Sequence, residues 1–393
     1  CLVMALSILS EFIKWFWQQG TKGAARLKYF QQIGGGAIQM RCCARACKGT
    51  SVSSRQTKGT RGQRLEPWKV GLDQYGLSPL ELSPLDILRW AVDHGADGVH
   101  FSGFEPEWQQ RLDHGCLKEL RTFAESESLY LEWGGAGHIP RDMTNWSVRD
   151  LFDANHIVAT QAEHLGVQIV RSCSGGLMRW TDVAPSTEIL LRETATALRA
   201  QREMLRDHGV ILAIELHFEF TTYELLRLFE MCDASPGDWL GVVLDTMNVL
   251  TMLEEPVRAT ERILPWVVST HLKDGGVRSV PAGWETFPTA IGEGMVDLSG
   301  VIRHLERSDR SIHLSVEDHG GSFSLPIRDE GFLAKFPDAT EEEMTAIATL
   351  ARRNQQADHC VPTERADWPA LCEARMSQNL IAAKRLVADA GLS

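Results

Sequence analysis

Four segments of the sequence share one pattern, an apolar run that ends in an acid or a histidine. The residues that end these runs are Glu215, Asp245, His271 and Glu317. Runs of this length and β-branching are typical of strands buried on both faces, as in a parallel sheet. A buried strand holds an unpaired Glu215 only at a high cost in free energy, so some group must compensate its charge. We expect one divalent metal ion, shared by all four side chains, to provide that compensation.

The expected ion follows from the ligand types. Three carboxylates and one imidazole suit Mn²⁺, Mg²⁺, Co²⁺ or Zn²⁺, and we expect Mn²⁺. Without a cation the three carboxylates would repel one another, and some would have to bind protons.

Other polar residues occur near the same strand ends. Because side chains alternate along a strand, His217 points the same way as Glu215, and Lys273 the same way as His271. Arg171 ends an earlier apolar run. We expect all three to contact a small polyhydroxylated or carbonyl substrate. His217 has an alternative role in orienting a ligand, and Arg171 and Lys273 have an alternative role as ion-pair partners.

The elements that must position these residues repeat regularly after Pro67. Eight strands alternate with helices over about 325 residues, which is the arithmetic of a (β/α)8 TIM barrel. In such a barrel the carboxyl ends of the strands surround one shared mouth. A long loop is expected over 275–296, and helical patterns at about 339–355 and 369–390 form a C-terminal extension. The predicted strands are 69–75, 97–102, 129–134, 167–172, 211–217, 241–247, 267–272 and 312–317.

Local signals place several helix ends. Ser83 followed by Pro84 predicts a helix start, and Gly209 predicts the end of a long helix that begins near Ser186. Thr221 with Glu224 is a capping-box candidate. The alternative fold, a doubly wound open sheet, lacks support because no G-x-G-x-x-G follows the first strand and no G-x4-G-K-[ST] occurs.

Charge is distributed unevenly along the chain. The sequence has 393 residues and a formal net charge of −12. Residues 1–64 hold eleven Lys and Arg and one acid, a net charge of +10, which leaves −22 for the remainder. An acidic body argues against binding to a phosphate backbone, so no nucleic-acid partner is expected.

The first 66 residues differ from the rest. We interpret 1–66 as a basic extension of low order that is expected to be disordered, or as a non-native segment, and 67–393 as the barrel domain. Residues 1–17 are apolar but interrupted by Glu11 and Lys14, and the run is too short for a membrane span. Nine cysteines without a paired spacing imply no disulfide framework. We therefore expect a cytoplasmic protein without a membrane partner. A homo-oligomer is compatible with these expectations.

Across residues 68–390 the sequence resembles the xylose-isomerase-like TIM-barrel superfamily, also called the sugar phosphate isomerase/epimerase family. The motifs that carry the resemblance are I-E-L-H (214–217), L-D-T-M-N (244–248), T-H-L-K-D (270–274), G-E-G-M-V-D (292–297) and S-V-E-D (315–318). The resemblance implies that Glu215, Asp245, His271 and Glu317 bind the metal. It further implies that Glu215 and Glu317 are the catalytic acid/base pair, which moves a proton through an enediolate.

Two positions depart from the ketose 3-epimerases of this family. Those enzymes have a substrate-binding histidine three residues after the metal-binding aspartate, where this chain has Asn248. We assign Asn248 to substrate binding by its position. Their additional glutamate, six residues after the first ligand, is Thr221 here.

The expected function is therefore a divalent-metal-dependent isomerase or epimerase of a sugar or sugar-derived keto acid. One alternative is a lyase, a dehydratase or decarboxylase of a keto-inositol or 3-oxo sugar acid, which would use the same enolate. A second is an apurinic-site endonuclease, which would need more histidines and a basic face. A third is a sugar-binding barrel without catalytic activity.

Overall fold

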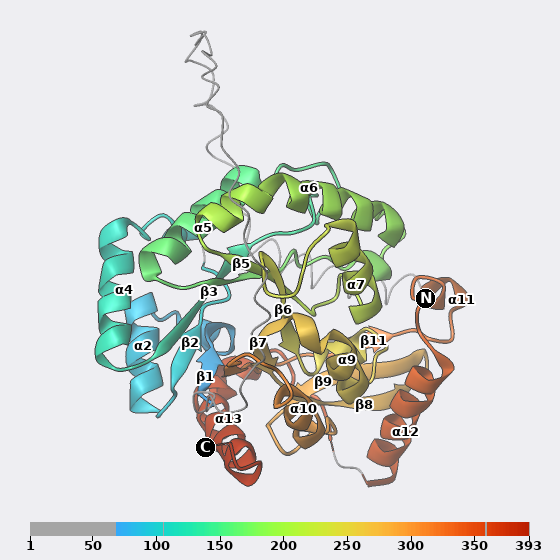
Figure 1. Ribbon diagram of the computed structural model, residues 1–393. Coiled ribbons are helices and arrows are strands. Elements are labelled where there is room, and N and C mark those ends of the chain that lie inside the picture. The colour runs from blue at the N-terminus through green and yellow to red at the C-terminus, as the bar shows by residue number, and fades with distance from the viewer. Residues whose placement is uncertain (1–67, 105, 358–359, 393) are drawn as a thin grey trace, which may run out of the picture. The chain divides into compact units, whose positions relative to one another are not determined.

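The computed structural model describes residues 68–104, 106–357 and 360–392, all within one unit, residues 65–393. The predicted extension 1–66 lies outside the described residues, so its order stays a prediction. The central feature is a closed barrel of eight parallel strands in the order β1-β10-β7-β6-β5-β4-β3-β2 (Figure 1). This confirms the predicted fold. The barrel strands are β1 (Val70–Asp73), β2 (Gly98–His100), β3 (Tyr130–Ala136), β4 (Ile169–Ser172), β5 (Ile211–Glu215), β6 (Leu240–Asp245), β7 (Val267–Leu272) and β10 (Leu314–Val316).

Helices surround the barrel strands (Figure 1). Three of them begin or end with the signals read from the sequence: Ser83 caps the first, Thr221 and Glu224 form a reciprocal capping box, and Gly209, with φ +65°, follows the long helix over 187–207. The helices that follow strands β1 to β7 are α2 (Pro84–Asp93), α3 (Pro106–Gln109), α4 (His114–Ser126), α5 (Phe152–Leu165), α6 (Thr187–Asp207), α7 (Thr222–Met231), α8 (Asn248–Thr251), α9 (Pro256–Ile263) and α10 (Leu298–Leu305). Short 3₁₀ turns occur at η1 (Gln74–Leu80), η2 (Met178–Trp180) and η3 (Leu264–Trp266).

The prediction of a long loop over 275–296 is wrong for most of this segment. Strands β8 (Asp274–Val280) and β9 (Gly283–Thr289) form an antiparallel hairpin there, and β11 (Phe323–Leu325) pairs with β9. This small sheet lies beside the barrel and next to α12 (Glu341–Ala357) (Figure 1). The hairpin forms because its two strands pair with each other over their whole length and bury Val277 and Phe287.

The part of the segment that remains a loop is fixed by one carboxylate. Asp274 accepts hydrogen bonds from the backbone N–H groups of Gly275, Gly292, Gly294 and Val296. A Cβ atom on Gly294 would lie 2.0 Å from Asp274 Oδ1, so only glycine fits this approach. The T-H-L-K-D and G-E-G-M-V-D motifs are therefore joined by a structural contact.

The predicted C-terminal helices are present, and the last one completes the barrel wall. Between them and the small sheet comes the short helix α11 (Glu330–Leu333). Helix α13 (Trp368–Asp389) packs against β1, β10 and η1. Trp368 Nε1 donates to the carbonyl of Gly76 at 3.1 Å, and Asn379 Nδ2 donates to Asp318 at 2.8 Å. The helix therefore covers the place where the first and last barrel strands meet.

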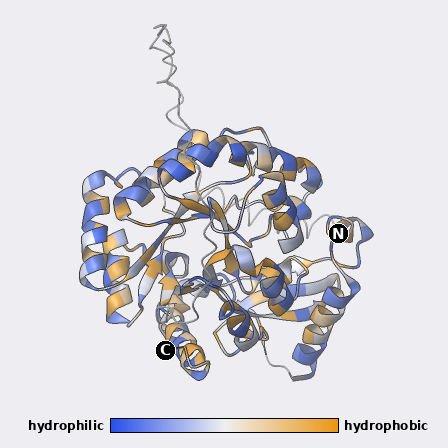
Figure 2. Cartoon of the chain, in the orientation of Figure 1, coloured by the Kyte–Doolittle hydropathy of each residue, from blue (hydrophilic) through white to orange (hydrophobic). Residues whose placement is uncertain are grey.

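The apolar runs of the sequence form the core. Figure 2 shows the barrel strands mainly in the hydrophobic colour, while the surrounding helices carry both colours. Every residue of β1, β6 and β7 is buried. Among the described residues, no helix is both long and apolar enough to span a membrane.

Candidate metal centre

Four side chains converge at the carboxyl ends of β5, β6, β7 and β10. They are the four predicted from the sequence, Glu215, Asp245, His271 and Glu317, and all four residues are buried. One ligand atom from each lies within 4.8 Å of the others. The parallel register explains this, because Asp245 pairs with His271 and Glu215 with Val243 at the same level of the barrel.

The distances between these atoms fit a single small cation. His271 Nδ1 lies 3.1 Å from Glu215 Oε1 and 2.9 Å from Glu317 Oε2. Ligands that bind an ion at about 2.1 Å in octahedral geometry are separated by about 3.0 Å. The donor atoms are thus spaced as a coordination sphere requires.

The local charge also fits a divalent cation. Four buried carboxylates lie here, those of Asp73, Glu215, Asp245 and Glu317. Two cationic side chains form ion pairs with them, Arg171 with Glu215 and Lys273 with both Asp245 and Glu317, and Asp73 faces His271. Four negative charges and two positive charges leave −2 when His271 is neutral, as a metal ligand must be. One divalent ion would neutralise that remainder. Burial lowers the pKa of His271, but Glu317, Asp73 and Glu215 raise it well above its usual value, so without an ion the ring provides part of the positive charge.

Hydrogen bonding points to the same atoms. Asp245 Oδ2 and Glu317 Oε2 are buried and accept no hydrogen bond of acceptable geometry, although Lys273 Nζ lies 2.9 and 3.1 Å from them. The other oxygen of Asp245 is satisfied, since Oδ1 accepts from the backbone N–H groups of Met247 and Asn248 at 2.8 and 2.7 Å. The backbone thus holds Asp245 with Oδ2, and not Oδ1, directed toward Lys273 and the centre.

The pKa values show how unevenly the centre is compensated. Burial raises the pKa of Asp245, and Lys273 does not fully offset this because Glu317 and Glu215 also raise it. Burial acts on Glu215 in the same direction, but Arg171 and His271 hold the pKa of that carboxyl well below its usual range. Asp245 is therefore the carboxylate most in need of a further positive charge.

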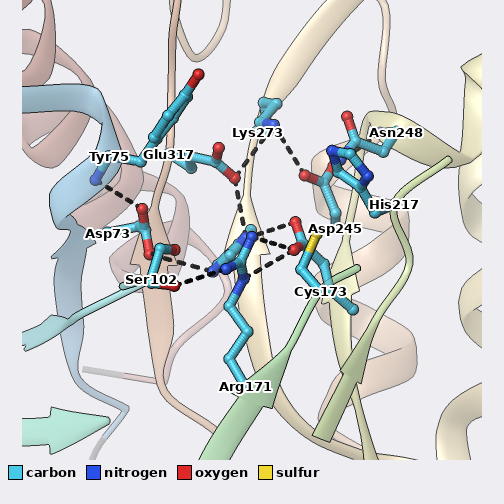
Figure 3. Close-up of polar contacts among 12 residues, drawn as sticks. Asp73, Tyr75, Ser102, Arg171, Cys173, His217, Asp245, Asn248, Lys273 and Glu317 are labelled. Carbon is cyan, nitrogen blue, oxygen red and sulfur yellow. Dashed lines mark hydrogen bonds and ion pairs between the residues drawn. The ribbon is translucent and has the colours of Figure 1, made fainter. Parts of the chain in front are cut away.

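The predicted substrate residues Arg171 and Lys273 contact the centre itself. Arg171 Nε donates to Glu215 Oε2 at 2.7 Å, and its Nη1 donates to the carbonyl of Ser102 at 2.9 Å. Lys273 is 1% exposed at its side chain and bridges Asp245 and Glu317. Figure 3 shows Arg171 and Lys273 reaching the carboxylates from opposite sides.

His217 belongs to a second cluster beside the first. Its Nδ1 lies 3.1 Å from Glu219 Oε2, and Cys173 Sγ lies 3.9 Å from Glu219 Oε1. The His217 side chain is 22% exposed, more than any of the four predicted ligands. Glu219 and Cys173 carried no readable signal, because both lie in loops where neighbours in space are far apart in sequence.

The two positions that depart from the epimerase pattern have structural roles. Thr221 is 4% exposed, and its side chain caps α7 by accepting from Glu224 N. Asn248 is buried at the start of α8, and its backbone N–H supports Asp245 (Figure 3 shows its side chain next to His217).

One residue of the centre was missed in the sequence. Asp73 ends β1 and lies with Oδ2 3.3 Å from His271 Nε2. The signal was present, because V-G-L-D (70–73) is an apolar run ending in an acid, like G-V-V-L-D (241–245).

Comparison with known proteins gives the family and the fold. The family described as xylose isomerase-like TIM barrel matches residues 88–349, which is two thirds of the chain. No curated protein matches the sequence.

Three solved structures illustrate the likeness, each with a TM-score of 0.50. The probable 3-DHS dehydratase AsbF from Bacillus anthracis is 17% identical, with 63% of this chain and 92% of that chain covered. A xylose isomerase-like TIM barrel protein from Mycobacterium smegmatis, in complex with magnesium, is 17% identical over 71% and 98%. D-psicose 3-epimerase from Clostridium cellulolyticum H10, with D-tagatose, is 13% identical over 75% and 100%. At these identities the likeness shows the fold alone, but together with the sequence match and the closed barrel it leads to one conclusion. This chain belongs to the xylose isomerase-like TIM barrel family.

Proposed function

We propose that this protein is a divalent-metal-dependent isomerase or epimerase of a sugar or a sugar-derived keto acid. The observation that carries the proposal is the buried cluster of Glu215, Asp245, His271 and Glu317, whose donor atoms have the spacing and residual charge of a divalent site. Mn²⁺ is the expected ion, and the magnesium in the Mycobacterium smegmatis relative supports a hard divalent cation.

The chemistry of the site follows from its charges. A divalent ion held by these four side chains would polarise a carbonyl or hydroxyl of the substrate and so lower the pKa of the adjacent C–H bond. Glu215 and Glu317 approach the centre from different strands, β5 and β10. One carboxylate would remove a proton, and the other, in its protonated form, would donate a different proton to the opposite face of the enediolate.

The carboxylates of Glu215 and Glu317 have different ion-pair partners, and we assign them different roles in proton transfer. Each has two charged partners among the described residues, but Glu215 uses both oxygens, Oε2 toward Arg171 and Oε1 toward His271, whereas Glu317 faces His271 and Lys273 with Oε2. Oε1 of Glu317 takes part in neither pair, so this oxygen is the one available to bind a proton. We therefore assign the first proton abstraction to Glu317, and the charge of Arg171 to stabilising the developing negative charge.

Recognition of the substrate would fall to groups around the same mouth. Lys273 and Arg171 provide positive charge, and His217 and Asn248 provide hydrogen-bonding groups on the side of β5 and β6 (Figure 3). This combination suits a small molecule with several hydroxyls and a carbonyl.

A lyase reaction is the second candidate. Two polar groups used by the ketose 3-epimerases are absent here, because Thr221 and Asn248 stand at their positions. Thr221 caps a helix and Asn248 begins one. A dehydratase or decarboxylase would start from the same enolate and then lose water or CO₂. The solved structures of similar fold include both a probable dehydratase and an epimerase.

The test is an activity screen of the metal-loaded protein over ketoses, inososes and 3-oxo sugar acids, followed by NMR in D₂O. An isomerase or epimerase introduces solvent deuterium at the reacting carbon, while a lyase releases water or CO₂. Glu317→Gln should lower turnover by about 10²- to 10⁴-fold, because general acid–base catalysis contributes that factor. The exposed Glu341→Gln on α12 is the matched control. A barrel that only binds sugar would show ligand binding and no turnover in either variant or the wild type.

A further inference from the structure

Asp73 lies on the far side of the His271 ring from the proposed metal centre. It is the last residue of β1 and is fully buried. Its Oδ2 is 3.3 Å from His271 Nε2, an ion-pair distance at which the geometry of a hydrogen bond is not reached in this structure, while Nδ1 of the same ring faces Glu215 and Glu317. The imidazole is therefore placed between one carboxylate and the cluster of ligand atoms.

This arrangement has a known physical consequence. A histidine that binds a metal through one nitrogen usually donates its other N–H to a carboxylate or carbonyl, which fixes the tautomer and the ring orientation. With the proton of the neutral ring on Nε2, facing Asp73, the lone pair of Nδ1 points toward Glu215 and Glu317.

Asp73 is also connected to a second ligand. Ser102 Oγ donates to Asp73 Oδ2 at 2.5 Å, and the carbonyl of Ser102 accepts from Arg171 Nη1 at 2.9 Å. Arg171 in turn donates to Glu215. Figure 3 shows Asp73 and Ser102 together on one side of the centre, with Arg171 reaching it from below. The contacts form a closed ring from Asp73 through Ser102, Arg171, Glu215 and His271 back to Asp73.

The carboxylate itself is anchored by the backbone. Asp73 caps η1, and its Oδ1 accepts from Tyr75 N at 2.8 Å. One oxygen is thus fixed by the chain and the other serves His271 and Ser102. Such anchoring keeps the ring in place when the ligands reorganise.

We propose that Asp73 is a positioning residue of the metal centre: it orients His271 so that Nδ1 is the ligand atom and, through Ser102 and Arg171, it fixes Glu215. This inference rests on the proposed metal-dependent function. It goes beyond that function because it assigns a role to a residue outside the four ligands.

Another arrangement of the same atoms serves as an outcome of the test. Asp73, His100 and His271 also have ligand atoms within 4.8 Å of one another, so Asp73 could itself bind a second ion. A positioning residue changes the affinity of one site, whereas a ligand changes the number of ions bound.

The experiment compares Mn²⁺ binding by calorimetry in the metal-free full chain, for wild type and Asp73→Asn. The asparagine keeps an oxygen for Tyr75 N but cannot accept from His271 as a carboxylate does. We expect one equivalent in both proteins and a Kd raised by about 10- to 100-fold in the variant, the usual effect of removing such a partner. Excess Mn²⁺ should restore much of the turnover.

Controls separate charge and stability from positioning. Glu132→Gln removes another buried barrel carboxylate, whose described partners are Ser269 and His100, and should change the Kd less. The melting temperature of the metal-free proteins is measured as well, because a purely structural role would lower it without a selective loss of affinity. Ser102→Ala, which keeps the carboxylate and removes one bond, should give a smaller rise in Kd and replaces Asp73→Asn if that variant does not fold.

Each outcome has a distinct meaning. Binding in wild type with an unchanged Kd in Asp73→Asn and Ser102→Ala overturns the positioning role and leaves the proposed function intact. Two equivalents in wild type and one in Asp73→Asn make Asp73 a ligand and also overturn it. No Mn²⁺ binding by wild type overturns the metal-dependent function itself.

Discussion

Two clusters of metal-ligand residue types lie side by side at the mouth of this barrel, and they differ in how their oxygens are used. In the first, Asp245 Oδ2 and Glu317 Oε2 accept no hydrogen bond of acceptable geometry from any described residue, and both face Lys273 Nζ. In the second, Glu219 Oε1 accepts from three backbone N–H groups, at 3.0, 2.5 and 3.3 Å, and Oε2 pairs with His217. The three N–H donors are those of Ser174, Gly175 and Gly176.

The difference teaches that residue type and proximity are not enough to identify a metal site. Cys173, His217 and Glu219 satisfy the same distance criterion as the first cluster. However, Glu219 is already saturated by the protein, and its charge has a partner in His217. In the first cluster, two carboxylate oxygens share one ammonium group, that of Lys273, and the carboxylates outnumber the Lys and Arg side chains paired with them. We therefore expect the protein to bind one ion there and to use the second cluster to hold a loop and orient His217.

The largest expected effect tests the structural role of the second cluster. Glu219→Ala should lower the free energy of unfolding by about 3–5 kcal/mol, because three backbone donors lose their acceptor at about 1–3 kcal/mol each when buried. Chemical denaturation of the metal-free protein measures it. The exposed Glu230→Ala on α7 should stay within about 0.5 kcal/mol of wild type. Equal stability of the two variants would contradict the structural role of the Glu219 carboxylate.

The next effect tests the first cluster. Mn²⁺ at 100 times its Kd should raise the free energy of unfolding by about 2.7 kcal/mol, since the ion binds only the folded state. Thermal unfolding with and without chelator measures the gain. Cys173→Ser should show the same gain and one bound equivalent, as should Cys116→Ser on α4. A loss of one of two equivalents in Cys173→Ser alone would make the second cluster a metal site.

The smallest effect concerns a histidine beside the second cluster. His138 is fully buried, its Nδ1 contacts Ser172 Oγ, and burial lowers its pKa from 6.5 to about 4, which Glu219 only partly offsets. Between pH 6.5 and 4 the unfolded chain binds a proton that the folded chain does not, so stability falls as the pH falls through this window. At pH 5 the loss is about 2 kcal/mol, at about 1.36 kcal/mol per pKa unit.

Removing the titrating ring isolates this contribution. The difference in unfolding free energy between pH 7 and pH 5 should be smaller by that amount in His138→Gln than in wild type, while the exposed His114→Gln keeps the wild-type difference. Identical pH dependence in all three proteins would show that the ring has the same pKa in the folded and unfolded chain, and would contradict the lowered pKa of His138.

The fold was predictable because each barrel strand is a buried apolar run with turn signals around it. The same feature allowed the sequence to predict that the four proposed ligands lie together, because the ends of parallel strands meet at one mouth of a barrel. The hairpin of β8 and β9 was missed because its strands pair outside the barrel and contain Gly275, Gly276 and Gly283, residues typical of loops. The pattern of β-strand pairing was not visible in the local sequence.

Residues of the site outside the strand ends were harder to predict. Glu219 is placed by a loop that bends back so that its carboxylate meets Ser174 to Gly176, more than 40 positions earlier. Lys273 was expected to contact substrate or an ion-pair partner; the structure pairs it with Asp245 and Glu317, and its contact with substrate stays a prediction. Such contacts depend on tertiary geometry, which single-sequence patterns do not contain.

The closure of the barrel sets the order in which the centre can be assembled during synthesis. Strand β1 pairs with β10, Val70 opposite Leu314, and α13 covers that junction. Translation from Glu215 to Asp389, the end of α13, spans 174 residues and takes about 10–35 s at 5–20 residues per second. During that time Glu215 already exists, but Glu317 and the contact of Asp73 with His271 are added only as the barrel closes. Uptake of the ion is therefore expected to be one of the last events in the folding of this barrel, after α13 has been synthesised.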